Sequence, residues 1–167
     1  MSDEIKKGLV GVISDETKVS EVMPEINSLT YRGYAVQELC EKCNFEQVAY
    51  LLLHGELPNP DELKAFEEYE RTNRNISDTL KNIIKNYPKN AHPMDTTRTT
   101  VSHMGLEDPD AEDSSPESNM RKSMRLLAQI STAVAANFRI RKGQEIINPD
   151  LSLSFSENFF HMSFGKV

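Results

Sequence analysis

The stretch SPESNMRKSMRLLAQISTAVAANFRIRKG, residues 115–143, decides the fold because it predicts one long helix. Ser115 can cap this helix, and Pro116 fits its first position. Gly143 suits a left-handed stop, and the basic residues before it favour a helix C-terminus. With a rise of about 1.5 Å per residue the helix would be about 40 Å long, longer than a small domain is wide.

The apolar residues in the second half of this helix do not keep to one stripe. One face carries Leu127, Val134 and Phe138. Another face carries Leu126, Ile130, Ala133 and Ile140. A helix that is apolar on several faces must be covered on several faces. We therefore expect the helix either to be central to a larger bundle or to be buried against a second copy of itself.

Composition excludes several classes of partner. The 167 residues suffice for one domain, and the net charge of −7 opposes non-specific binding to nucleic acid. No apolar run approaches the roughly 20 residues of a membrane span. The start, MSDEIKKG, lacks the apolar core of a signal peptide, and the chain has only two cysteines. These features predict a cytoplasmic protein with no nucleic-acid or membrane partner.

Residues 8–34 are the only segment that predicts strands. Residues 8–13 are short and β-branched, and residues 28–34 alternate with a period of two. A polar connection containing Pro24 separates them. We expect a small N-terminal β-ribbon, followed by helices over residues 35–167, and hence a mainly α fold class.

Capping signals delimit the remaining predicted helices. The first predicted helix covers residues 35–42, with Val36, Leu39 and Cys40 inward, and the second covers residues 45–54 and ends at Gly55. A surface helix begins at Pro60, a short helix begins at Ser77, and another helix begins at His92 and stops at Gly105. The last predicted helix covers residues 154–164.

Cys40 and Cys43 form a CxxC motif. A zinc site needs a second pair of ligands, and His54 alone does not supply one at a usual spacing. A thioredoxin-type redox pair needs a strand before it and a helix after it. Both cysteines instead lie near a helix end in a helical setting, so we interpret them as two buried or half-buried thiols.

The acidic loop at residues 107–114 has alternating carboxylates, Asp108, Asp110 and Glu112, as a calcium loop does. A calcium loop also needs glycine at its sixth position and glutamate at its twelfth, where this chain has Asp113 and Asn119. We interpret the segment as a solvated loop.

The four histidines, His54, His92, His103 and His161, do not share metal-ligand spacing. The chain also lacks a nucleophile–histidine set, a glycine-rich phosphate loop and paired carboxylates in an apolar context. The residues alone therefore predict a helical domain without an active site.

Several segments resemble the large domain of the citrate synthase family. They are KGLVGV (7–12), YRGY (31–34), FEQVAYLLLHGELP (45–58), HPMD (92–95), Arg98-Thr99, Val101-Ser102, SENF (156–159) and Phe164-Gly165. They span nearly the whole chain in family order. The stretch EDSSP (112–116), together with Glu157-Asn158-Phe159, is more similar to the 2-methylcitrate synthase branch.

The resemblance implies an almost all-α dimeric enzyme that condenses acetyl-CoA or propionyl-CoA with oxaloacetate. Acyl-CoA is then a substrate, and no cofactor is implied. By resemblance, a subunit contact would involve the helices from Met94 to Met104 and from Met120 to Ile140.

The resemblance also implies that the family's catalytic histidines, aspartate and carboxylate-binding arginines belong to motifs C-terminal to residue 167, as does its small domain. None of the four histidines matches a family catalytic position. We therefore assign no catalytic, substrate-binding, cofactor-binding or metal residue to this chain. We expect residues 1–167 to be the N-terminal part of the large domain, inactive alone and with exposed apolar surface. The alternative is a non-enzymatic helical dimerisation module or one half of a split synthase.

Overall fold

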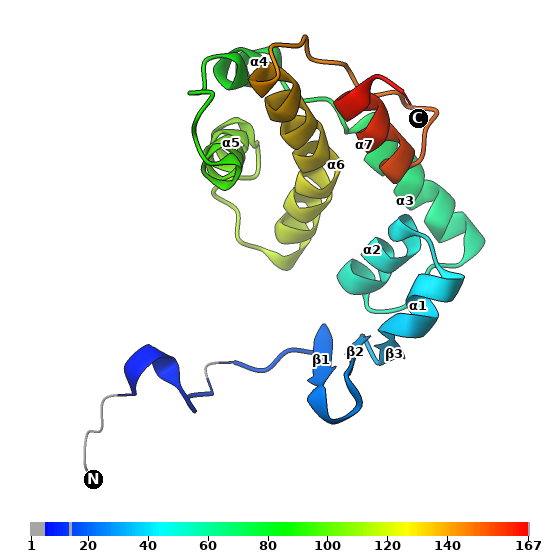
Figure 1. Ribbon diagram of the computed structural model, residues 1–167. Coiled ribbons are helices and arrows are strands. Elements are labelled where there is room, and N and C mark those ends of the chain that lie inside the picture. Colours follow the sequence, from blue (N-terminus) through cyan, green and yellow to red (C-terminus); the bar gives the residue numbers. More distant parts are fainter. Residues whose placement is uncertain (1–5, 14, 167) are drawn as a thin grey trace.

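The computed structural model describes residues 6–13 and 15–166. These residues form seven α-helices, two short 3-10 turns and one three-stranded antiparallel sheet (Figure 1). The predicted mainly α fold is confirmed. Residues 1–5, which carry most of the charged start considered above, lie outside the described residues. Within the described residues, no helix combines the length and the apolar character that crossing a bilayer requires.

The small sheet contains β1 (Ser20–Met23), β2 (Ser28–Tyr31) and β3 (Tyr34–Ala35), in that order. The turn from β2 to β3 consists of Arg32 and Gly33, both at positive φ (51° and 88°). Two such residues make the tight hairpin turn whose twist matches that of the strands. The predicted N-terminal β-ribbon is therefore present, within residues 20–35.

The prediction of a strand at residues 8–13 is wrong. Lys7–Leu9 form a 3-10 turn, and the residues after it are irregular. Gly8 and Gly11 have φ values of 64° and 73°, which interrupt an extended backbone. The pairing strand lies instead in the connection that we interpreted as polar, where Val22 pairs with Leu29.

Four helices follow the sheet: α1 (Val36–Lys42), α2 (Phe45–His54), α3 (Pro60–Thr72) and α4 (Asp78–Lys85). The capping prediction for α2 is confirmed, because the Asn44 side chain accepts from the Gln47 N–H and the Gln47 side chain accepts from the Asn44 N–H. Asn59 and Glu62 form the same reciprocal cap on α3. These local hydrogen bonds satisfy the free N–H groups of each first turn.

Helix α5 (Pro93–Glu107) is longer than predicted. It passes through Gly105, which does not adopt positive φ. The helix ends at Asp108, whose backbone is extended, and the Asp108 side chain accepts a hydrogen bond from the Asp110 N–H. The stop is therefore set by an aspartate turn rather than by the glycine.

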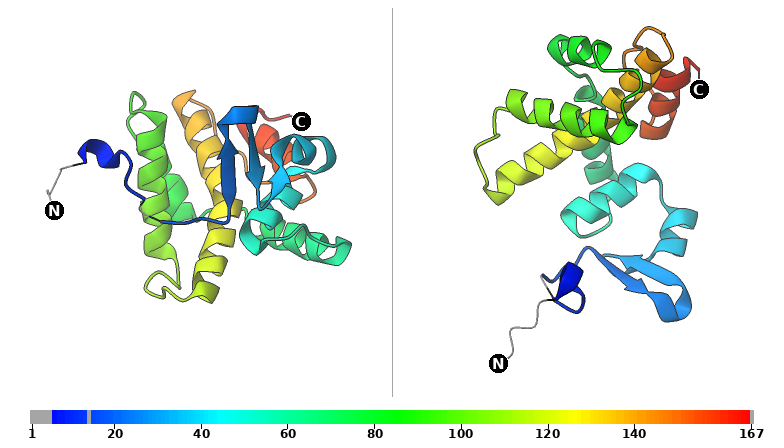
Figure 2. Two further views of the ribbon diagram at one scale, coloured as in Figure 1. Left: turned by 90° about the horizontal axis from the view of Figure 1, so that it is seen from below. Right: turned by 60° about the vertical axis from the view of Figure 1, so that its left-hand side comes forward.

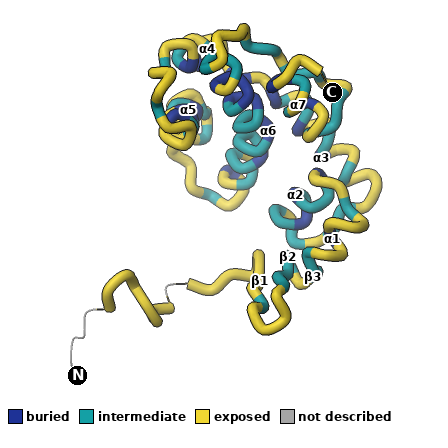
Figure 3. The backbone as a smooth tube through the Cα atoms, viewed as in Figure 1, coloured by how far each residue is buried: buried dark blue, intermediate teal, exposed yellow. Residues whose placement is uncertain are grey.

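Helix α6 (Pro116–Arg141) is the centre of the fold, with Ser115 as its N-cap and Gly143 at φ 71° just beyond its end. Helices α3, α4, α5 and α7 (Phe155–Phe164) all pack on it (Figure 1). Its buried small residues let these helices approach closely, and Figure 3 shows the resulting buried segments. They are Ala128, Thr132, Ala133, Ala135 and Ala136. We expected α6 either to be central to a larger bundle or to pack against a second copy of itself. The bundle is present within the chain itself.

Two apolar clusters flank α6. One joins α4, α5 and α6 through Ile76, Leu80, Ile84, Met104, Ala133 and Ala136. The other joins α2, α3 and α6 through Ala49, Phe66 and Met124. Figure 2 shows α5 and α6 side by side. The sheet lies at a distance from the part of the bundle that contains α4.

Candidate functional site

The contact between α5 and α6 is the surface that the sequence singled out. Asn137 on α6 donates a hydrogen bond from its Nδ2 to the Oγ1 of Thr96 on α5 at 2.7 Å, and both residues are buried. Thr96 and Thr100 also donate to the carbonyls of Pro93 and Thr96 in their own helix. The bond from Asn137, which comes from the neighbouring helix, supports this threonine-rich segment of weak helix propensity.

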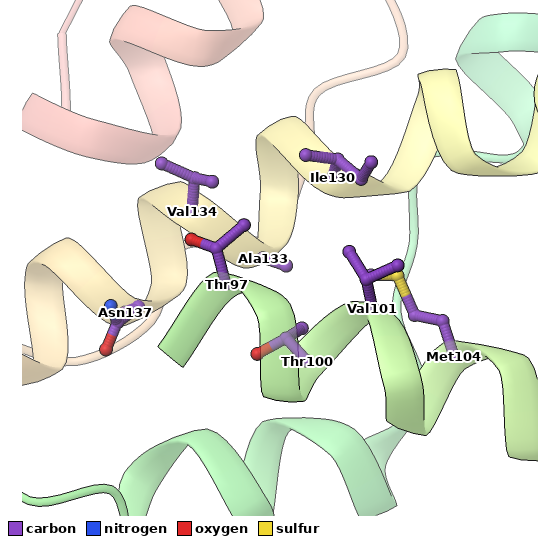
Figure 4. A pocket seen from close by; sticks show the side chains of 8 residues that line it. All are labelled: Thr97, Thr100, Val101, Met104, Ile130, Ala133, Val134 and Asn137. Atoms are coloured by element: carbon purple, nitrogen blue, oxygen red, sulfur yellow. The ribbon is translucent and has the colours of Figure 1, made fainter. Parts of the chain in front are cut away.

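A narrow hollow, with no room for a water molecule, lies along this contact (Figure 4). Val101 and Thr97 of α5 lie beside it, as do Ile130 and Val134 of α6 (Figure 4). None of the side chains that line it is titratable, so this hollow suits the packing of another surface rather than acid–base chemistry. The two segments predicted for the subunit contact are only partly exposed. Met94 is 66% exposed, whereas Met104 is buried in the core.

Most residues of the acidic loop are exposed, as we predicted for a solvated loop, but two of its aspartates form an ion-pair network that we did not predict. Arg125 donates to both carboxylate oxygens of Asp108 at 2.9 and 2.7 Å and to Asp110 at 2.7 Å. Arg121 donates to both oxygens of Asp110 at 3.1 and 2.9 Å. Glu112 remains exposed. The loop is thereby fastened to the first turns of α6.

These bonds lower the pKa of both aspartates. For Asp108 the main cause is the hydrogen bonding from Arg125, and for Asp110 it is Arg121 followed by Arg125. The same contacts raise the pKa of Arg125, chiefly through Asp108. Arginines four residues apart at the start of a helix, directly after an acidic turn, were the sequence signal that we missed.

Each histidine has a place that needs no catalytic role. His54 is stacked on Tyr50 with ring centroids 4.0 Å apart. The Nδ1 of His92 accepts the Met94 N–H at the start of α5, and His103 lies 3.3 Å from a Glu107 oxygen on its own helix. His161 is half-buried on α7.

The cysteines differ from our prediction. Cys40 is exposed rather than inward, while Cys43 is half-buried, and both are free. Leu39 takes the buried position on α1, which packs on β2 and β3. Among the described residues, no three histidine, cysteine or acidic side chains are placed to hold a metal ion.

Buried charges near α7 were also missed. Glu70 and Arg74 are almost excluded from solvent, and Arg74 donates to the backbone carbonyls of Asp150 and Leu153 before α7. A carboxylate oxygen of Glu46 on α2 accepts the Phe155 N–H at the start of α7. These groups hold α7 against α2 and α3, and the four-residue spacing between Glu70 in α3 and Arg74 just beyond its end was the available signal.

Comparison with known proteins shows which family the chain matches. The family model described as "Citrate synthase, C-terminal domain" matches residues 8–167. The chain is 47% identical to a 2-methylcitrate synthase of Mycobacterium tuberculosis over 98% of its own length and 41% of the relative's. It is also 47% identical to a citrate synthase of Mycolicibacterium smegmatis, over 98% of its own length and 43% of that protein.

A solved structure shows the same fold. It is a ternary complex of citrate synthase from Thermoplasma acidophilum with carboxymethyl coenzyme A and oxaloacetate. The TM-score is 0.92 at 23% identity, and the match covers 99% of this chain and 43% of that one. The chain thus spans about two fifths of the length of the proteins that it matches. Because the family model matches nearly the whole sequence, this chain belongs to the citrate synthase family.

Proposed function

We propose that this chain supplies the scaffold and dimer-interface helices of an enzyme that condenses an acyl-CoA with oxaloacetate, as citrate synthase or 2-methylcitrate synthase. The observation that carries the proposal is 47% identity, over nearly the whole chain, to relatives bearing these two names. Since both names occur at the same identity, either acetyl-CoA or propionyl-CoA fits as the acyl substrate. The alternative of a stand-alone interaction protein loses its motive, because four helices of this chain already cover α6.

In the proposed reaction, a carboxylate removes a proton from the carbon beside the thioester carbonyl. Positioned hydrogen-bond donors stabilise the resulting enolate, which then attacks the oxaloacetate carbonyl. Water then hydrolyses the thioester of the product, and the coenzyme A thiol leaves. We propose that the side chains for these steps come from sequence other than these 167 residues. The role of this chain is then to position that part, as the N-terminal portion of the large domain.

A thiol-release assay tests this division of labour. The purified chain, supplied with oxaloacetate and either acyl-CoA, should release no coenzyme A thiol. Co-expression with the part of the M. tuberculosis relative that this chain does not match should restore release. Turnover by the chain alone would refute the proposal, and so would a folded mixture without activity.

We propose that the subunit contact lies on the hollow between α5 and α6. Its mainly apolar, non-titratable lining supports this, together with the exposure of Met94 in the first turn of α5. Val101→Glu or Val134→Glu would bury a charge in the contact, which costs several kcal/mol, about enough to dissociate a dimer. Sedimentation velocity should show a dimer for the unmodified chain and for Lys64→Glu on α3, but a monomer for the two α5–α6 variants.

A further inference from the structure

The two cysteines lie at the end of α1, away from every contact proposed above. Cys40 is in the last turn of α1, and Cys43 directly follows the helix. The Cys43 N–H donates to the Leu39 carbonyl at 2.9 Å and closes the last turn of α1, while Cys43 itself is extended, with φ −121° and ψ 151°. Cys40 and Cys43 therefore lie three positions apart in the chain, at the point where α1 ends.

Both side chains also open onto the same hollow. It has a volume of about 240 Å³, and its lining includes Cys40, Cys43, Tyr31 and Phe45. Cys40 is exposed, and Cys43 is half-buried. A disulfide needs Cβ atoms about 3.5–4.5 Å apart, so closure requires the short connection between α1 and α2 to adjust until the two Cβ atoms reach that distance.

The surroundings favour dithiol chemistry over metal binding. A structural zinc site needs four ligands, and no group of three ligating side chains occurs among the described residues. The sequence contains no third cysteine that could compete for either sulfur. A pair with one accessible thiol and one sheltered thiol matches an attacking and a resolving cysteine.

We propose that Cys40 and Cys43 form a reversible intramolecular disulfide by exchange with a small-molecule disulfide such as oxidised glutathione. The Cys40 thiolate attacks one sulfur of the small molecule, which forms a mixed disulfide and expels one thiolate. The Cys43 thiolate then attacks the Cys40 sulfur, which forms the Cys40–Cys43 bond and expels the second thiolate. The two protein thiols are oxidised, the small disulfide is reduced to two thiols, and the two protons pass to the leaving groups.

The site directly precedes the start of α2. Asn44, the N-cap of α2, is the next residue, and Phe45 stacks on Phe155 of α7 with ring centroids 4.2 Å apart. The oxidised and reduced forms therefore differ at the junction between α1 and α2, and the bridge does not touch the α5–α6 hollow.

The test uses the purified full chain and excess oxidised glutathione. After exchange, the protein is denatured, alkylated with N-ethylmaleimide and weighed by intact mass spectrometry. We expect monomer that has lost both free thiols and carries no glutathione, and a reductant should restore both thiols. A persistent glutathione adduct, a covalent dimer or two alkylated cysteines would overturn the proposal.

Three variants test the order of attack and the spacing. Cys43→Ser should retain glutathione on Cys40, and Cys40→Ser should form its adduct more slowly because Cys43 is sheltered. Equal rates in these two variants would overturn the assignment of Cys40 as the attacking thiol. Adding Glu41→Cys to Cys43→Ser places the second thiol on a neighbouring, exposed position, and this chain should also retain the adduct. Bridge formation in that variant would mean that the shared hollow is irrelevant.

Discussion

Arg74 and Glu70 form an ion pair that is almost completely excluded from solvent. The Arg74 Nη2 donates to the Glu70 Oε2 at 2.6 Å, and the two side chains are 0% and 1% exposed. The Arg74 Nη1 also donates to the carbonyls of Asp150 and Leu153, at 3.0 and 2.9 Å. One guanidinium thus joins the end of α3 to the loop that leads into α7.

The first prediction concerns this pair. Glu70→Gln should lower the free energy of unfolding by about 3–5 kcal/mol, because it leaves the Arg74 charge buried without a counter-charge. Urea unfolding followed by far-UV circular dichroism measures the loss. The matched control is Glu67→Gln, whose partner Arg71 is 31% exposed, and its loss should stay below about 1 kcal/mol. Similar losses in the two variants would contradict the buried-pair account.

The second prediction concerns acid stability. Arg125 holds the pKa of Asp108 below its ordinary value, so the folded state binds fewer protons than the unfolded state. The stabilisation is present above the ordinary aspartate pKa of about 4 and is lost as the pH falls through the lowered folded value. Asp108→Asn should therefore flatten the acid side of a plot of unfolding free energy against pH.

At neutral pH the same Asp108→Asn variant should lose about 1–3 kcal/mol, since hydrogen bonds to a charged partner are weakened. Glu112→Gln, on the exposed part of the loop, should change stability there by less than about 0.5 kcal/mol. An acid profile for Asp108→Asn that parallels the unmodified chain would rule out this role for the Arg125 contact.

The third prediction concerns the buried hydrogen bond across α5 and α6. Asn137→Ala removes the donor to Thr96 and should cost about 1–3 kcal/mol in thermal or urea unfolding. Thr99→Ala on the exposed side of α5 removes only a hydroxyl that bonds its own helix, and alanine favours helices. That control should be neutral or slightly stabilising. A neutral Asn137→Ala variant would show that the bond does not hold the two helices.

The fourth prediction concerns exposed apolar surface, which the sequence anticipated and the structure confirms. Phe160 and Phe164 on α7 are 54% and 53% exposed, and their rings lie 5.8 Å apart. The chain should bind a hydrophobic dye, because contiguous apolar patches do so whereas single apolar residues do not.

Changing both residues to serine should reduce the dye fluorescence by more than half. The control is Leu106→Ser, which removes an exposed leucine of α5 outside this aromatic group and should leave the signal nearly unchanged. Equal reductions in the two proteins would show that the α7 group is not the dye site.

The differences between prediction and structure have physical causes. The β-branched residues at 10–13 predicted a strand, but Gly8 and Gly11 turn the chain, and no strand among residues 6–13 and 15–166 pairs with this segment. Gly105 predicted a helix end, but a glycine ends a helix when it adopts a positive φ, and Gly105 does not adopt one. Cys40 was placed inward from its spacing, yet a helix of seven residues buries little more than Leu39.

The sequence alone determined the features that depend on neighbouring residues. Helix starts are one such feature, because each cap is a hydrogen bond within one turn, as at Asn44, Asn59, Ser115 and Ser154. The motifs by which the family is recognised are also local. The tertiary structure alone decided which faces of α6 are covered, which arginines pair with Asp108 and Asp110, and which carbonyls Arg74 binds. Those contacts join residues between 11 and 79 positions apart, and composition or periodicity cannot specify such pairings, because they depend on the packing of whole helices.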